Sequence, residues 1–163
     1  MSIQWRDGMA IDHGVIDHDH QTLIAIINEF CEAPLDRGRL LELQRIFDKL
    51  DRYTKVHFER EETLQRAANY PYRDAHHHEH LALIHEMEEL RKRFADMVQS
   101  MGDVVVVSAA QCEDLAKLRA TMAEFLRYWL VDHILKSDLR MKPYAQEMSR
   151  HSGGFAPLSR AAA

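Results

Sequence analysis

Four long segments of this chain carry apolar residues three and four positions apart, which is the spacing of one face of an α-helix. In the first segment Ile16, Leu23, Ile27 and Phe30 follow this spacing, and His20 stands in the same row. The expected helices cover residues 17–31, 39–68, 72–99 and 109–139. The chain has only 6 glycines and 4 prolines, a composition that favours long helices over a turn-rich β fold. The pattern therefore predicts an all-α protein.

Short connections between consecutive helices predict an up-down-up-down four-helix bundle. Residues 1–15 lack the helical pattern and are expected to form an N-terminal arm that packs on the bundle through Trp5. We expect one domain over residues 1–148. Residues 149–163 show no periodicity and are predicted to be a flexible C-terminal tail.

Charge and hydropathy exclude several classes of partner. The net charge is −5 with no basic block, so nucleic acid is not an expected partner. No apolar run approaches the roughly 18 residues of a membrane span. The first residues, MSIQWRDGMA, carry charges where a signal peptide would be apolar, which predicts a cytoplasmic protein. Cys31 and Cys112 are far apart in sequence and form no CxxC pair, which argues against a disulfide framework and a zinc knuckle.

Ionisable side chains interrupt the apolar stripes at metal-ligand spacing. The seven are His20, His57, Glu61, His76, His80, His133 and Asp138. In an alternating bundle all of these positions lie at the same end. Burying a carboxylate without a counter-charge costs several kcal/mol, so we expect cations here.

The spacing within each helix supports a shared site. His57 and Glu61 are four residues apart, so they lie on one helix face, as do His76 and His80. His133 and Asp138 are five apart, which requires the end of that helix to bend or loosen.

Five imidazoles and two carboxylates are too many for one small ion and suit two ions that share bridging carboxylates. Imidazole with carboxylate favours iron, with manganese or zinc as competitors. An odd number of histidines divides as three and two, which leaves one ion with an open position for a small molecule. Any one of these histidines alone could be a hydrogen-bonded core residue, but five at one level favour a metal centre. The neighbouring Glu62 and the adjacent His77 and His78 are interpreted as solvated or supporting groups.

Four motifs resemble those of the bacterial hemerythrins: V-I-D-H-D-H around His20, H-F-E-R-E-E from His57, Y-P-Y-R-D-A-H-H-H-E-H from Tyr70, and W-L-V-D-H-I-L-K-S-D from Trp129. The resemblance spans about residues 5–144. It implies a non-haem di-iron centre, with two iron ions that change between Fe2+ and Fe3+ and a bridging oxo or hydroxo group. It also implies reversible O2 binding for oxygen carriage, storage, delivery or sensing, in a protein that is not an enzyme.

The resemblance also implies a role for each ligand. His76, His80 and His133 would hold the six-coordinate iron, His20 and His57 the iron with the open position, and Glu61 and Asp138 would bridge both. The O2 pocket must be apolar, because water and protons would promote oxidation of the site. Leu23, Ile27, Phe58, Leu130 and Ile134 lie beside the ligands at helical spacing, and Leu130 is the first choice for its wall. Asp17, Asp19 and Asp132 are candidate acceptors for the outer N–H groups of ligand histidines.

Two alternative functions remain, besides a weaker alternative in which the site binds zinc, although no HExxH motif occurs in the chain. A di-iron redox enzyme acting on O2, peroxide or nitric oxide is the first, although the Glu-x-x-His motif of ferritin-like enzymes does not occur in the chain. A sensor that signals to a separate protein partner is the second. Many relatives carry Gln before the first ligand histidine, where this chain has Asp19, a difference that bears on oxidation rate.

Overall fold

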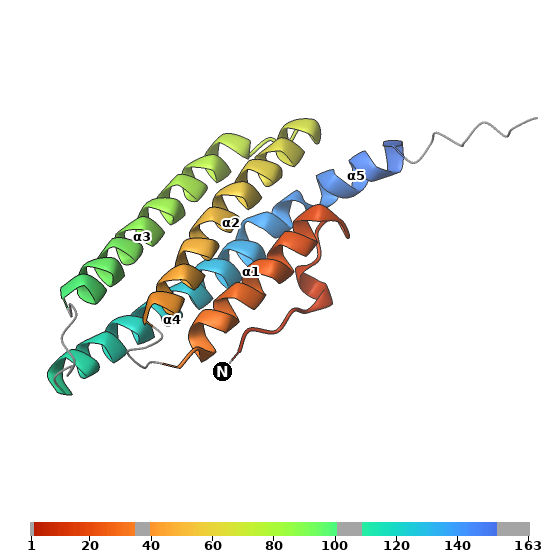
Figure 1. The fold of residues 1–163 in the computed structure, drawn as a ribbon. Coiled ribbons are helices and arrows are strands. Elements are labelled where there is room, and N and C mark those ends of the chain that lie inside the picture. The colour runs from red at the N-terminus through yellow and green to blue at the C-terminus, as the bar shows by residue number, and fades with distance from the viewer. Residues whose placement is uncertain (1, 35–39, 101–108, 153–163) are drawn as a thin grey trace, which may run out of the picture.

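The computed structural model describes residues 2–34, 40–100 and 109–152, without the side chains of residues 109–112, 151 and 152. Five α-helices occur in these ranges: α1 (Val15–Glu32), α2 (Leu40–Ala67), α3 (Arg73–Ser100), α4 (Ala109–Lys136) and α5 (Lys142–Ser152). Helices α1 to α4 lie side by side and alternate in direction (Figure 1). The predicted all-α four-helix bundle is therefore confirmed.

The apolar stripes predicted from the sequence face one another in a continuous core. At the end where α1 finishes and α2 begins, the core is built from phenylalanines: the rings of Phe30 and Phe47 are 5.6 Å apart, and those of Phe30 and Phe94 are 6.5 Å apart. All three side chains are at most 1% exposed. Burial of each contributes roughly 1.5–3 kcal/mol, so these three rings stabilise this end of the bundle through the hydrophobic effect.

The N-terminal arm is fastened to α1 at both of its ends. The Asn28 side chain accepts from the Ile3 N–H at 2.8 Å and donates to the Ile3 carbonyl at 2.9 Å. The carboxylate of Asp17 accepts from the backbone N–H groups of Ile11 and His13 at 2.7 and 2.8 Å. These bonds hold the arm, which includes the short helix η1 (Asp7–Met9), along the bundle.

The first turn of α1 donates backbone hydrogen bonds to the side chain of Asp12. The Asp12 carboxylate accepts from the N–H groups of Gly14, Ile16 and Asp17 at 2.8 to 3.2 Å. An acidic side chain at this place satisfies helix N–H groups and interacts favourably with the helix dipole. The start of α1, and with it His20, is thereby fixed in position.

The end of α4 differs from a continuous helix. Regular α-helix stops at Lys136, and a 3-10 turn, η3 (Asp138–Met141), leads directly into α5. The expected helix over 109–139 is therefore three residues too long, while the expected loosening between His133 and Asp138 is confirmed. Helix α5 continues to Ser152, past residue 149 where the predicted C-terminal tail begins. Residues 153–163 lie outside the described part, so the flexible tail stays a prediction.

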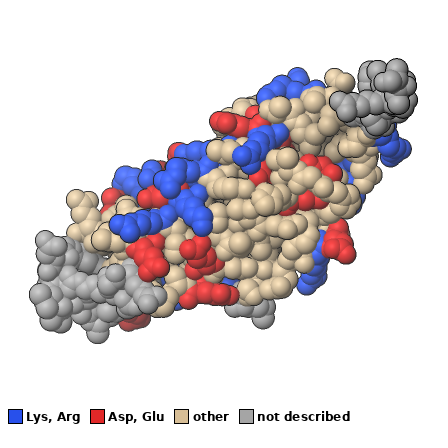
Figure 2. Space-filling model, turned by 45° about the vertical axis from the view of Figure 1, so that its right-hand side comes forward, with Lys and Arg blue, Asp and Glu red and all other residues tan. Residues whose placement is uncertain are grey.

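Three further observations bear on the sequence predictions. Among the described helices, none is long and apolar enough to cross a membrane. Basic and acidic side chains lie side by side over the face shown in Figure 2. Cys31 is a partly buried free thiol, and the side chain of Cys112 lies outside the described residues.

Candidate metal centre

All seven side chains predicted as metal ligands meet at one end of the bundle, where α1 and α3 begin and α2 and α4 end (Figure 1). They form two groups within which the potential ligand atoms all lie within 4.8 Å of one another. The larger group contains Glu61, His76, His80, His133 and Asp138, and the smaller contains His20, His57 and Asp138. Each of these side chains is at most 8% exposed. The structure therefore supplies two adjacent buried sites that share one carboxylate.

Asp138 belongs to both groups because the 3-10 turn directs its carboxylate into the bundle. Its Oδ2 lies 3.2 Å from Nε2 of His20. Its Oδ1 lies 3.2 Å from Nε2 of His76 and 3.0 Å from Nε2 of His133. The two oxygens thus face different histidine sets, which is the arrangement that a bridging carboxylate needs.

Glu61 also extends between the two groups. Its Oε2 lies 3.2 Å from Nε2 of His80 in the larger group and 3.7 Å from Nε2 of His57 in the smaller. The separation of four residues on α2 places His57 and Glu61 on the same helix face, as predicted. A second carboxylate therefore lies between the two sets of imidazoles.

Buried polar atoms without partners mark the centre. Within the described residues, both carboxylate oxygens of Glu61, both of Asp138 and Nε2 of His20 and of His76 are buried without a hydrogen bond. Such atoms normally cost free energy because they have lost water and gained no partner. Cations between them would satisfy all of these atoms at once, so the residues present fit a two-metal site.

The surroundings of the two carboxyl groups shift their pKa values in opposite directions. Burial, followed by the nearby Asp138, raises the pKa of Glu61 well above its ordinary value. Burial acts in the same direction on Asp138, but the neighbouring His133, His20 and His76 outweigh it and hold the pKa of Asp138 well below its usual range. Burial and Asp138 thus favour the protonated form of Glu61 in the absence of metal, and a bound cation would take the place of that proton.

Two of the histidines are held in the neutral form that binds metals. Burial, with the charges of His133 and His76, lowers the pKa of His80 to about 2. Burial also lowers the pKa of His57. A neutral imidazole has a free lone pair on one nitrogen, so both rings are ready to coordinate a cation.

Acidic side chains face the outer nitrogens of three of the histidines. Nδ1 of His80 lies 3.0 Å from Glu62, Nδ1 of His57 lies 3.6 Å from Asp19, and Nδ1 of His133 lies 3.8 Å from Glu79. The Glu79 carboxylate also accepts from the Ser137 hydroxyl at 2.5 Å. Partners of this kind fix the orientation of a ligand ring and raise its basicity.

Sequence reasoning identified these outer partners only in part. Asp19 faces His57 as suggested, but Asp17 binds the N-terminal arm and Asp132 pairs with Lys136 at 2.6 Å on the outside of α4. Glu62, interpreted as a solvated group, instead contacts both His77 and His80 and is only 19% exposed. Glu79 was not singled out at all. No sequence spacing indicated Glu62 or Glu79, because their partners depend on how α3 packs against α2 and α4.

The apolar residues predicted to surround the small-molecule site are all buried in the main core. Phe58 is in direct contact with the histidines: its ring stacks on His80 with centroids 3.7 Å apart and an interplanar angle of 6°. It also lies 5.5 Å from the ring of His57 and 5.7 Å from that of His133. The other four, Leu23, Ile27, Leu130 and Ile134, are at most 2% exposed. Their role as a pocket wall stays a prediction.

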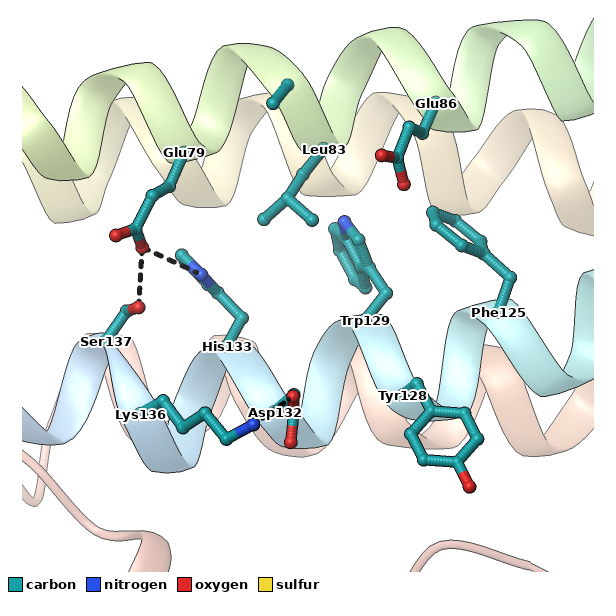
Figure 3. A pocket seen from close by; sticks show the side chains of 11 residues that line it. Glu79, Leu83, Glu86, Phe125, Tyr128, Trp129, Asp132, His133, Lys136 and Ser137 are labelled. Carbon is teal, nitrogen blue, oxygen red and sulfur yellow. Dashed lines mark hydrogen bonds and ion pairs between the residues drawn. The ribbon is translucent and has the colours of Figure 1, made fainter.

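A surface cavity of about 440 Å³ lies between α3 and α4, beside His133. Leu83, Trp129 and Phe125 form its apolar side, and His133 lies in its lining (Figure 3). Dashed lines in Figure 3 connect Glu79 to Ser137 and His133 at one end of this cavity. Of the ligand-type histidines, His133 is thus the one that lines a described cavity.

Comparison with known proteins agrees with this geometry. The family described as the hemerythrin HHE cation binding domain matches residues 13–145, a range that contains all seven clustered side chains. A bacteriohemerythrin of Stenotrophomonas maltophilia (strain R551-3) is 30% identical over 152 residues, covering 93% of this chain and 85% of the relative. Those of Pseudomonas aeruginosa (strain LESB58) and Methylococcus capsulatus (strain Bath) are 27% and 28% identical, covering 82% and 77% of this chain and 75% and 82% of the relatives.

Proposed function

This chain belongs to the hemerythrin family, and from that membership we propose that it binds O2 reversibly at a non-haem di-iron centre. The observation that carries the proposal is the pair of adjacent buried ligand groups joined by Asp138. A single-metal site would need only one of these groups, and a purely structural core would not leave both carboxylates without partners.

We assign the seven side chains to two iron ions. His76, His80 and His133 would hold one ion and His20 and His57 the other, and the carboxylates of Glu61 and Asp138 would be shared between them. The smaller group offers fewer imidazoles, so the ion held there would be the one left open to O2. When bound, the two ions supply the redox chemistry of O2 binding.

The protein side chains keep this chemistry reversible by excluding water. Phe58 covers one face of His80, and the predicted wall residues Leu23, Leu130 and Ile134 belong to the same dry core. Water and protons promote irreversible oxidation, so an apolar surrounding favours release of O2 unchanged. Reversible binding of O2, rather than its catalytic conversion, is consistent with a family whose members are generally O2 binders.

The test is metal content combined with visible absorption of anaerobically reduced protein that is then exposed to air. We expect two irons per chain and a colour that appears with O2 and disappears under vacuum. Rapid, irreversible conversion to the ferric state would instead favour a redox enzyme acting on O2, peroxide or nitric oxide. Zinc or manganese in place of iron would contradict the proposal. The O2 affinity and oxidation rate then distinguish carriage and storage from sensing.

A further inference from the structure

The carboxylate of Asp19 is completely buried beside the smaller ligand group, one residue before His20 on α1. Its Oδ1 accepts two hydrogen bonds, from the Tyr53 hydroxyl at 2.8 Å and from the Arg60 guanidinium at 2.7 Å. Both donors come from α2, on the same face as His57. The orientation of the Asp19 side chain is therefore fixed from one side.

The other oxygen of the same carboxylate is directed at a ligand. Asp19 Oδ2 lies 3.6 Å from Nδ1 of His57. Within the part of the chain that the structure describes, neither atom has a hydrogen-bond partner. Two buried polar atoms that face each other and have no other partner are best satisfied by one N–H shared between them.

We propose that Asp19 is a positioning residue that orients His57 and, through its negative charge, makes the iron held by His57 and His20 easier to oxidise. The inference rests on the proposed function, because it assigns His57 to the ion with the open position. An anionic acceptor on the outer nitrogen raises the basicity of a ligand imidazole. A more basic ligand stabilises ferric relative to ferrous iron, so Asp19 lowers the reduction potential of this ion.

His57 is distinguished from the other ligand histidines by the burial of this partner. The Glu62 carboxylate that faces His80 also contacts His77 and is partly exposed, and the Glu79 carboxylate near His133 is 47% exposed. Solvent weakens the charge of such exposed acids. Among the described acids that face an outer nitrogen of a ligand histidine, Asp19 is thus the one whose full burial allows its charge to act most strongly.

Arg60 weakens this effect, because its guanidinium binds Oδ1 of Asp19, the oxygen that does not face His57. Its side chain is 47% exposed and it touches neither group of ligand atoms. Removing the arginine charge leaves more of the negative charge of Asp19 directed at His57. Changes at Asp19 and at Arg60 should therefore move the reduction potential in opposite directions, which a merely structural role would not produce.

The test measures the midpoint potential and the autoxidation rate of the iron-loaded protein in three variants. Asp19→Asn should shift the ferric/ferrous equilibrium about tenfold toward ferrous iron, which is about 59 mV upward for a one-electron couple, and slow autoxidation. Arg60→Gln should lower the potential and hasten autoxidation. Asp132→Asn is the matched control, because Asp132 precedes His133 as Asp19 precedes His20 but pairs with Lys136 on the surface.

The outcomes separate this inference from the proposed function. An unchanged potential in Asp19→Asn, a shift equal to that of Asp132→Asn, or a rise in Arg60→Gln would overturn the role of Asp19 while reversible O2 binding stands. A wild-type protein without two irons would overturn the proposed function itself. If Asp19→Asn does not fold, as judged by thermal unfolding of the metal-free protein, the direction of the Arg60→Gln shift decides.

Discussion

Asp138 Oδ2 lies 3.2 Å from His20 Nε2, although one residue follows the last bundle helix and the other belongs to the first. Through Oδ1 the same carboxylate contacts His76 and His133. The contact depends on the 3-10 turn η3, because a continuous α-helix would direct a residue five positions after His133 to a different side. Completion of the centre therefore depends on this short turn.

Asp138→Asn should remove iron from both positions, because the carboxylate belongs to both ligand groups. We expect iron content to fall from two per chain to below one, measured by elemental analysis after anaerobic reconstitution. Asp132→Asn, on the outside of α4, should keep two irons and serves as the control for lost negative charge. A protein that kept two irons without the Asp138 carboxylate would contradict the assignment of a bridging ligand.

The fold, and the position of the ligand candidates at one level of the bundle, could be predicted from the sequence for a physical reason. Helical periodicity depends on residues three and four positions apart, and short connections require neighbouring helices to run in opposite directions. His20 and His133 could thus be placed at one end of the bundle without a structure. Phe58 could be placed beside the ligands because it lies three residues before Glu61 on the same helix.

The partners outside the ligands could not be derived in the same way. Glu62 contacts His80 across the α2–α3 corner, and Glu79 lies near His133 across the α3–α4 boundary. Such contacts depend on the relative rotation of two helices, which local periodicity does not fix. The role of Asp17 in fastening the arm was likewise hidden, since its partners are backbone N–H groups of a segment without a repeating pattern.

Glu61→Gln should change how the stability of the metal-free protein depends on pH. The folded-state pKa of Glu61 is raised by burial and by Asp138 above its ordinary value of 4.5. The contribution of protonated Glu61 to the free energy of unfolding is therefore complete below pH 4.5, and it is lost as pH rises through the folded-state pKa. The variant has no such loss, so its free energy of unfolding should improve relative to wild type as pH rises, by at most about 1.4 kcal/mol per pH unit.

Urea denaturation with a chelator between pH 4.5 and 8 measures this difference. The same measurement on iron-loaded protein provides the comparison. There a cation takes the place of the proton on Glu61, and the neutral glutamine of the variant supplies no negative charge to bind that cation. Wild type should then be the more stable of the two at neutral pH. A stability difference that does not change with pH in the metal-free state would show that Glu61 is not buried with a proton.

Glu62→Gln should weaken iron binding without removing a ligand. Glu62 accepts from Nδ1 of His80 at 3.0 Å, and loss of such a partner typically costs 10–100-fold in metal affinity. Competition with a chromophoric chelator gives the affinity directly. Glu59→Gln is a matched control on the exposed face of the same helix and should bind iron as wild type does. Equal affinities of the two variants would mean that the Glu62 contact does not orient His80.

Phe58→Ala should both destabilise the bundle and expose the centre. Removing a buried phenylalanine costs about 3–5 kcal/mol, and here it also uncovers the face of His80 on which the ring stacks at 3.7 Å. Water then enters beside the ligands, so autoxidation after exposure to air should be faster than in wild type. Visible absorption follows the oxidation, and urea denaturation gives the stability loss.

Phe47→Ala separates these two effects. Phe47 is as fully buried as Phe58 and lies on the same helix, but its ring packs on Phe30, about 16 Å further along the helix axis. It should lose a similar free energy of unfolding while autoxidising at the wild-type rate. Equal acceleration in both variants would attribute faster oxidation to general loosening of the bundle, whereas acceleration confined to Phe58→Ala assigns the exclusion of water to the ring that covers His80.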